Sequence, residues 1–166
     1  MPITISGSTG IAGVDGSPST PAVQGTDTNT GVYFGADTIS FSEGGALVGQ
    51  FDSSANFQFN SGYGSVATAY GCRAWVNFNG TGTVAIRASG NVTSITDNGV
   101  GDFTINFTNA LADANYAAVG TGDDAAGYVV NRRNGTAPTT TAFRLWAGQP
   151  GTAAQDPTYC FFAFFR

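Results

Sequence analysis

The sequence predicts an all-β protein, and three observations support this fold class. Lysine is absent, Glu43 is the single glutamate and only three leucines occur, so strong helix formers other than alanine are nearly missing. Threonine, valine, phenylalanine and tyrosine are frequent instead, and these residues favour pleated, half-buried surfaces. The third observation is a run of short alternating segments over residues 72–119, separated by Asn-Gly, Thr-Gly and Ser-Gly turns.

The first part of the chain predicts an extended arm followed by short strands. Residues 1–31 are rich in Gly, Ser, Thr and Pro and carry few large apolar groups, so they can bury little surface by themselves. We expect them to form either a flexible tether or an arm that is ordered against a partner. Short strands are expected after this arm at residues 32–34, 38–41, 47–51 and 56–60. Because residues 61–65 are rich in Gly and Ser, we place the end of the first domain at residue 65.

The second domain, residues 66–166, is predicted to be a β-sandwich of about eight strands with a jelly-roll-like topology. Turn signals recur about every ten residues. Within residues 73–78, Ala74, Val76 and Phe78 should share one face, with Trp75 on the other. The other strands are expected at residues 83–88, 92–96, 103–107, 116–120, 128–132, 143–147 and 159–165.

The last strand carries aromatic rings on both faces, at Phe161, Phe162, Phe164 and Phe165. It is either a central strand covered on both sides, or a strand with one face in the core and the other against a symmetry mate. We expect the second arrangement, because burying several rings at roughly 2 kcal/mol each would favour association. The segment 32–59 also needs cover, since a small sheet with large apolar groups hardly folds alone. The predicted oligomer interface comprises Phe34, Phe41, Phe57, Phe59, Phe162 and Phe164.

The residues available for chemistry exclude most enzyme classes. There is no histidine for a general base or an imidazole zinc site, and no lysine for a Schiff base or a phosphate-binding loop. Asp123 and Asp124 form either a glycosidase carboxylate pair or a solvated turn, and the turn is preferred. Residues 27–31 resemble the start of a calcium loop, but position twelve is Thr38, so an Asx turn is preferred. We therefore expect no enzyme activity, no cofactor and no metal.

Charge and cysteine content limit the partners further. Six arginines against eleven acidic residues give a net charge of −5, and no basic stripe exists, so nucleic acid is not expected as a partner. No apolar run reaches transmembrane length, and the first residues do not resemble a signal peptide, so we expect synthesis in a cytoplasm and no membrane insertion. Cys72 and Cys160 form one disulfide or remain as two buried thiols, which a reducing compartment favours.

Two blocks of the sequence resemble proteins of a known class. Residues 27–34 (DTNTGVYF), followed by residues 36–41 (ADTISF) and Gly44-Gly45, resemble a segment common in the tail-fibre proteins of tailed bacteriophages. Residues 72–107, residues 113–116 (DANY) and the ending Phe164-Phe165-Arg166 resemble the distal, receptor-binding domain of such fibres. Together these blocks cover most of residues 20–166.

The resemblance implies a homotrimeric, β-rich virion protein made in the host bacterium, without catalytic residues, that touches a host-surface glycan. It also implies that residues 1–31 attach to another virion protein. For sugar contacts we select loop groups in the second domain. Asn131 and Trp146 are also candidates, but core packing is favoured for Trp146. An alternative is a capsid-decoration or other tail structural protein with no receptor role, and a virion-borne hydrolase is a third. The predicted receptor-binding residues are Asp123, Asp124, Arg132, Arg133, Asn134 and Gln149.

Overall fold

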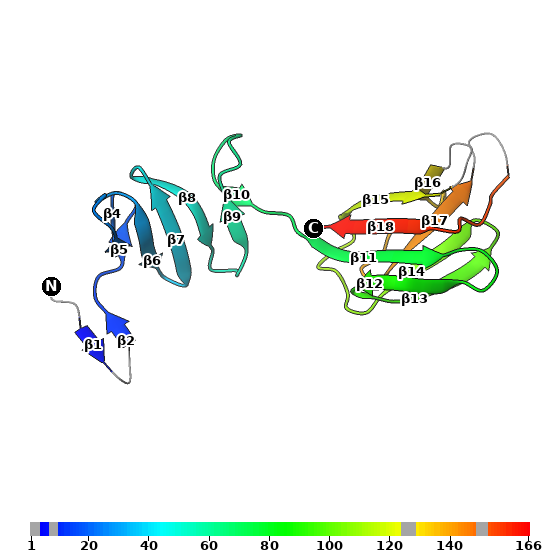
Figure 1. The fold of residues 1–166 in the computed structure, drawn as a ribbon, viewed down its shortest axis with the longest axis horizontal. Helices are drawn as coiled ribbons and strands as arrows, with labels where there is room; N and C mark the ends of the chain where they lie inside the picture. Colours follow the sequence, from blue (N-terminus) through cyan, green and yellow to red (C-terminus); the bar gives the residue numbers. More distant parts are fainter. Residues whose placement is uncertain (1–3, 7–9, 124–128, 149–152) are drawn as a thin grey trace. The chain divides into compact units, whose positions relative to one another are not determined.

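The computed structural model describes residues 4–6, 10–123, 129–148 and 153–166 (Figure 1). Over these residues it contains antiparallel strands and turns and no helix, which confirms the predicted all-β class. The chain divides into two compact units, Met1–Ala69 and Tyr70–Arg166. The predicted boundary at residue 65 lies four residues earlier, because β10 (Ala67–Thr68) still pairs with β9 (Phe57–Phe59) in the first unit.

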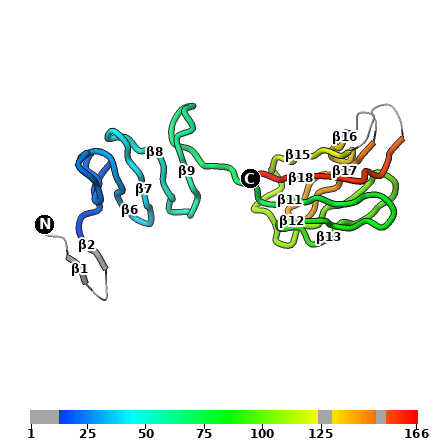
Figure 2. Tube along the Cα trace, viewed as in Figure 1, coloured from blue at the N-terminus to red at the C-terminus, as the bar shows by residue number. Residues whose placement is uncertain are grey.

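The first unit is built from short strands, and the pairings are local (Figure 2). β1 pairs with β2 and β3 pairs with β4, so the predicted arm of residues 1–31 contains two small hairpins in its described part. The remaining strands form a sheet in the order β10-β9-β8-β7-β6-β5. The strands not yet defined are β1 (Thr4–Ser6), β2 (Gly10–Ala12), β3 (Gly16–Ser17), β4 (Thr20–Pro21), β5 (Val23–Gln24), β6 (Gly31–Gly35), β7 (Thr38–Glu43) and β8 (Ala46–Phe51).

Two tight turns fix the register of this sheet. Gly44 and Gly45 connect β7 to β8 with φ values of 58° and 80°, and a two-residue hairpin turn with both values positive favours glycine. Before β6, the Asp27 carboxylate accepts hydrogen bonds from the Asn29 amide at 3.3 Å and the Thr30 hydroxyl at 2.8 Å. This arrangement confirms the predicted Asx turn at residues 27–31.

The second unit is a β-sandwich. In the part of the unit that the structure describes, two four-stranded antiparallel sheets have the orders β12-β11-β18-β15 and β13-β14-β17-β16. We call them the first and second sandwich sheets. The jelly-roll-like topology stays a prediction. The strands are β11 (Cys72–Asn79), β12 (Ala85–Gly90), β13 (Val92–Gly99), β14 (Asp102–Phe107), β15 (Ala117–Gly122), β16 (Val129–Arg132), β17 (Ala142–Gly148) and β18 (Cys160–Phe165).

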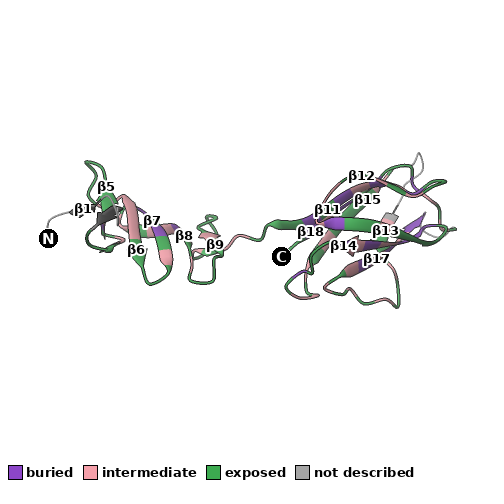
Figure 3. Ribbon diagram, turned by 90° about the horizontal axis from the view of Figure 1, so that it is seen from below, coloured by how far each residue is buried: buried purple, intermediate pink, exposed green. Residues whose placement is uncertain are grey.

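One hydrophobic core lies between the two sandwich sheets (Figure 3). Alternate residues of the central strands fill it, as expected for half-buried strands. Rings from the two sheets meet edge to face, for example Phe78 with Phe103 at 5.4 Å between centroids and Phe107 with Phe164 at 4.9 Å. The inward positions predicted for β11 and β14 are confirmed. They are Ala74, Val76, Phe78, Phe103, Ile105 and Phe107, all buried.

The face of β18 that enters the core corrects one prediction. β18 is a central strand between β11 and β15, and Phe162 and Phe164 are 5% and 0% exposed within a single chain. Their assignment to the oligomer interface is therefore wrong, because the chain's own core already covers both rings. Phe161 and Phe165 lie on the outer face and are 40% and 37% exposed.

Candidate functional site

The six-stranded sheet of the first unit has one apolar face, which we call the apolar sheet face. Paired residues in antiparallel strands place their side chains on the same face. One cross-strand row is Phe34, Ile39, Phe51 and Phe57, and a second is Val23, Val32, Phe41, Gly49 and Phe59. All four phenylalanines predicted from this segment as interface residues therefore lie on one face.

Within the first unit, no other layer of the described residues covers the apolar sheet face. Its phenylalanines and Ile39 remain between 36% exposed at Phe41 and 46% exposed at Ile39 and Phe51. The rings contact one another within the sheet, with centroids 5.4 Å apart for Phe51 and Phe57 and 6.2 Å apart for Phe57 and Phe59. A ring about 40% exposed leaves roughly 80 Å² in water, so the face presents roughly 500 Å² of apolar surface. A patch of this size on one sheet marks an interaction surface.

The opposite face of the same sheet carries a polar row whose side chains are hydrogen-bonded. Ser40, Gln50 and Gln58 form one cross-strand row. The Gln50 amide donates to the Gln58 side-chain oxygen at 2.6 Å, and the Gln58 amide donates to the Asp52 carboxylate at 2.8 Å. The two faces therefore differ in chemistry, and the apolar one is the face that needs a cover.

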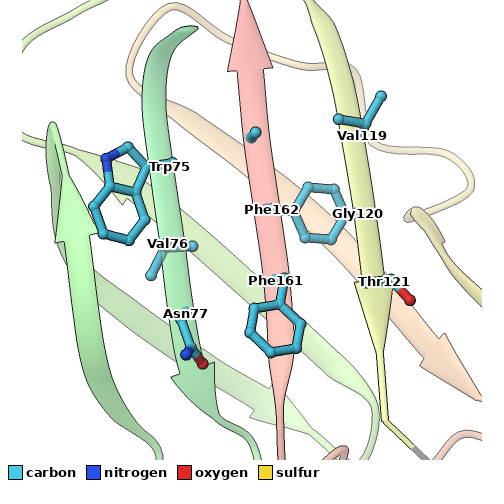
Figure 4. A pocket seen from close by; sticks show the side chains of 9 residues that line it. Trp75, Val76, Asn77, Val119, Gly120, Thr121, Phe161 and Phe162 are labelled. Atoms are coloured by element: carbon cyan, nitrogen blue, oxygen red, sulfur yellow. The ribbon is translucent and has the colours of Figure 1, made fainter.

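A second apolar surface lies on the outer face of the first sandwich sheet. Trp75, Ala163 and Val119 form one cross-strand row, and Asn77, Phe161 and Thr121 form the next. These residues line an open trough of about 650 Å³ (Figure 4). Trp75, Val119 and Phe161 are 44%, 56% and 40% exposed. The outer face of a sandwich sheet in water is normally polar, so this trough is a candidate interaction surface. The sequence analysis selected Phe162 and Phe164, which face the core, and it selected neither Phe161 nor Val119.

Gly120 explains how the floor of the trough is built. It pairs with Phe162, whose ring lies against the Gly120 backbone on β15. A Cβ atom at Gly120 would lie 2.4 Å from Cε2 of Phe162, closer than real contacts allow. The glycine therefore makes room for a core ring.

A third candidate site contains three of the predicted receptor-binding residues. Arg132, Arg133 and Asn134 line an open hollow of about 350 Å³ together with Asn131 and Trp146. We call this the arginine hollow. Trp146 lies on β17 between the buried residues Leu145 and Ala147, so its ring is on the outer face, directly opposite Asn131. The expectation that Trp146 packs in the core is therefore wrong.

A buried carboxylate orients the arginines beside this hollow. Asp102 is 7% exposed, and its two oxygens accept bonds from Nε and Nη2 of Arg144 at 2.8 and 2.9 Å. Arg133 Nε lies 3.3 Å from the same carboxylate. The hydrogen bond from Arg144, helped by the charges of Arg144 and Arg133, lowers the pKa of Asp102 despite its burial. The same hydrogen bond raises the pKa of Arg144.

The other predicted receptor-binding residues do not join the arginine hollow. The Asp123 amide donates to the Tyr159 carbonyl at 2.9 Å, and the Asp123 carboxylate accepts a bond from the Tyr159 amide. Asp123 therefore ties the end of β15 to the start of β18 and does not line the hollow. Asp124 and Gln149 lie outside the described residues.

The cysteines lie at opposite ends of paired strands. Cys72 pairs with Phe165 and is exposed, whereas Cys160 pairs with Phe78 and is buried. The two thiols are free and are about 20 Å apart along the strand, because six residues separate Cys72 from Phe78. Burial, together with the charge of Asp123, raises the pKa of Cys160 to about 12. The prediction of two buried thiols holds for Cys160 only.

Among the described residues, no group of three or more acidic, cysteine or histidine side chains is placed to hold a metal ion. The same part of the chain has no helix long and apolar enough to cross a membrane. Comparisons with protein-family models, with curated proteins and with solved structures found no match.

Proposed function

We propose that this chain is a non-enzymatic structural protein of a bacteriophage virion, a tail fibre or fibre tip that assembles as a homotrimer and contacts a host-surface glycan. Residues 1–31 attach it to another virion protein. The proposal combines the sequence resemblance with the surfaces described above. The uncovered apolar sheet face is the observation that carries it, because it requires a partner and presents four of the six phenylalanines selected from the sequence.

Copies of the same chain are the simplest cover for this face. Each copy presents roughly 500 Å² of apolar surface there, and a standard interface takes about 800 Å² from each partner. The trough around Trp75 and Phe161 adds a second apolar surface on the sandwich unit. Three copies that cover one another through both surfaces bury more area than the sheet face alone provides, and the scarcity of charged residues suits such burial.

The arginine hollow supports contact with a glycan. Trp146 offers the face of an indole ring for stacking, while Asn131 and Asn134 offer amides that both donate and accept hydrogen bonds. Sugars present ring C–H groups together with hydroxyl groups, so a binding site for them combines these two kinds of contact.

The assembly is tested by the mass of the full chain in solution. Sedimentation at micromolar concentration should give about 51 kDa, three times the chain mass of 16.9 kDa. Phe41→Asp and Phe57→Asp place a charge on the apolar sheet face and should shift the mass toward 16.9 kDa. Ser53→Asp adds the same charge at an exposed turn position and should leave the assembly intact. A wild-type chain that sediments as a monomer contradicts the proposal.

The position of the chain on the virion distinguishes a tail-fibre protein from a capsid-decoration protein. Gold-labelled antibody against the chain should mark the tail tip in electron micrographs of the phage. Labelling of the capsid instead supports the alternative of a decoration protein, which needs self-association but no glycan contact.

A further inference from the structure

The arginine hollow concentrates positive charge in an acidic protein. Arg132 and Arg133 line it and Arg144 lies beside it, and Asp102 pairs with Arg133 and Arg144, so these four groups sum to a charge of +2. The remaining three arginines and ten acidic residues of the chain sum to −7. The hollow is therefore an electropositive site on a protein whose overall charge repels anions.

The local ion pairs leave part of this charge available to a ligand. Arg144 engages both oxygens of Asp102, and Arg133 approaches the carboxylate through Nε alone. Arg132 uses Nη1 to bond the carbonyls of Arg133 and Thr136, and it has no carboxylate partner among the described residues. These bonds hold the guanidinium groups in place. A guanidinium held in this way recognises the two oxygens of a carboxylate or phosphate.

The hollow joins this charge to contacts suited to a sugar. Trp146 and the amides of Asn131 and Asn134 share its lining with Arg132 and Arg133. We propose that the arginine hollow binds a sugar that carries an oxyanion, either a carboxylate or a phosphate. This proposal rests on the glycan contact proposed above and names its chemical class. The sugar ring stacks on Trp146, its hydroxyls meet the amides, and the oxyanion meets Arg132 and Arg133.

The test compares neutral sugars with counterparts that carry a carboxylate or a phosphate. Calorimetry with the full chain at low salt measures the affinity for trigalacturonate against trigalactose, and for glucose 6-phosphate against glucose. We expect at least one anionic sugar to bind about 5–10-fold more tightly than its neutral counterpart, as for a charge-assisted hydrogen bond at an exposed site. The preference should weaken as salt is added, because exposed charges are screened. The carboxylate and phosphate pairs identify which oxyanion is preferred.

Variants then assign the preference to the hollow. Arg132→Gln should abolish the preference for the anionic sugar, and Arg132→Lys should retain only part of it, because lysine keeps the charge but loses the planar fork. Arg73→Gln is the matched control, since it removes one exposed arginine outside the hollow and should leave the preference unchanged. Trp146→Ala should weaken the binding of neutral and anionic sugars alike. Thermal unfolding of each variant shows whether the sandwich is intact.

The outcomes separate this inference from the proposed function. Equal affinity for the anionic and neutral sugars, with both weakened by Trp146→Ala, overturns the inference and retains the glycan contact. An anionic preference that Arg73→Gln lowers as much as Arg132→Gln also overturns it, because the preference then does not come from the hollow. If none of the four sugars binds the wild-type chain, both the inference and the glycan contact are rejected.

Discussion

Replacing a core phenylalanine of β18 should mainly affect folding, whereas replacing a surface phenylalanine of the same strand should mainly affect assembly. Phe164 is 0% exposed and packs against Phe107 and Phe143, with centroids 4.9 and 5.3 Å away. Phe161 lies on the outer face and is 40% exposed. Phe164→Ala therefore removes a ring from the core, whereas Phe161→Ala removes one from the trough.

The core position should dominate stability. Phe164→Ala should lower the free energy of unfolding by about 4 kcal/mol, because the lost transfer energy adds to the cost of the cavity. For a unit of this size, the melting temperature should fall by roughly 16–32 °C. Phe161→Ala should cost less than about 1.5 kcal/mol in the dissociated chain, since its ring is only partly removed from water. It should instead weaken self-association.

Fluorescence of Trp75 and Trp146 during denaturation by urea measures the free energy of unfolding. Sedimentation measures self-association. Protein concentration must be equal in all samples, because association adds to apparent stability. Phe165→Ala is a second control, because this ring is also on the outer face. If Phe161→Ala destabilises the chain as much as Phe164→Ala, the division of β18 into a core face and a surface face is refuted.

Three further predictions concern single groups. Because the pKa of Asp102 is lowered in the folded chain, its contribution to stability is present above about pH 4 and is lost as the pH falls through the folded pKa. Unfolding measured between pH 7 and pH 2.5 should show this loss, and Asp102→Asn should make the profile shallower; an unchanged profile contradicts the Asp102 pairings. A thiol reagent at pH 8 should modify one cysteine of the native chain, Cys72, and two after denaturation, whereas two in the native chain would show that Cys160 is not buried. Gly120→Ala should lower the free energy of unfolding by about 1–3 kcal/mol in the same urea assay, because the new methyl group displaces Phe162, and an unchanged midpoint would contradict that contact.

The sequence was sufficient where a pattern depends on residues close together in the chain. Alternation in residues 73–78 and 103–107 identified which side chains of β11 and β14 face the core, because the pleat places every second residue on the same side. The Asx turn at Asp27 follows from the reach of its own carboxylate to nearby amides.

Alternation failed to predict the inward face of β18, because both faces of that strand carry aromatic residues. The ending of the chain has rings at both residue parities, at Phe161 and Phe165 and at Phe162 and Phe164. Alternation therefore could not say which pair enters the core. Pairing with β11 and β15 decides this, because Phe164 lies opposite Ala74 and Ala118, whose small side chains leave room for a ring.

The arginine hollow likewise combines a part that the sequence predicts with a part that only the fold creates. Arg132, Arg133 and Asn134 are consecutive, so the sequence itself brought them together, but their meeting with Trp146 depends on the pairing of β16 with β17. Asp102 gave no local signal, because it lies 42 residues before Arg144, to which it bonds.

Composition and local alternation thus determined that this chain is built from strands, where most strands lie and which surfaces in the first unit are apolar. Only the tertiary structure decided which face of β18 is internal, that Asp123 ties two strands together, and that Asp102 orients the arginines. The physical reason is that alternation and turns are set by near neighbours, whereas burial and ion pairing depend on segments that meet only after the sheets form.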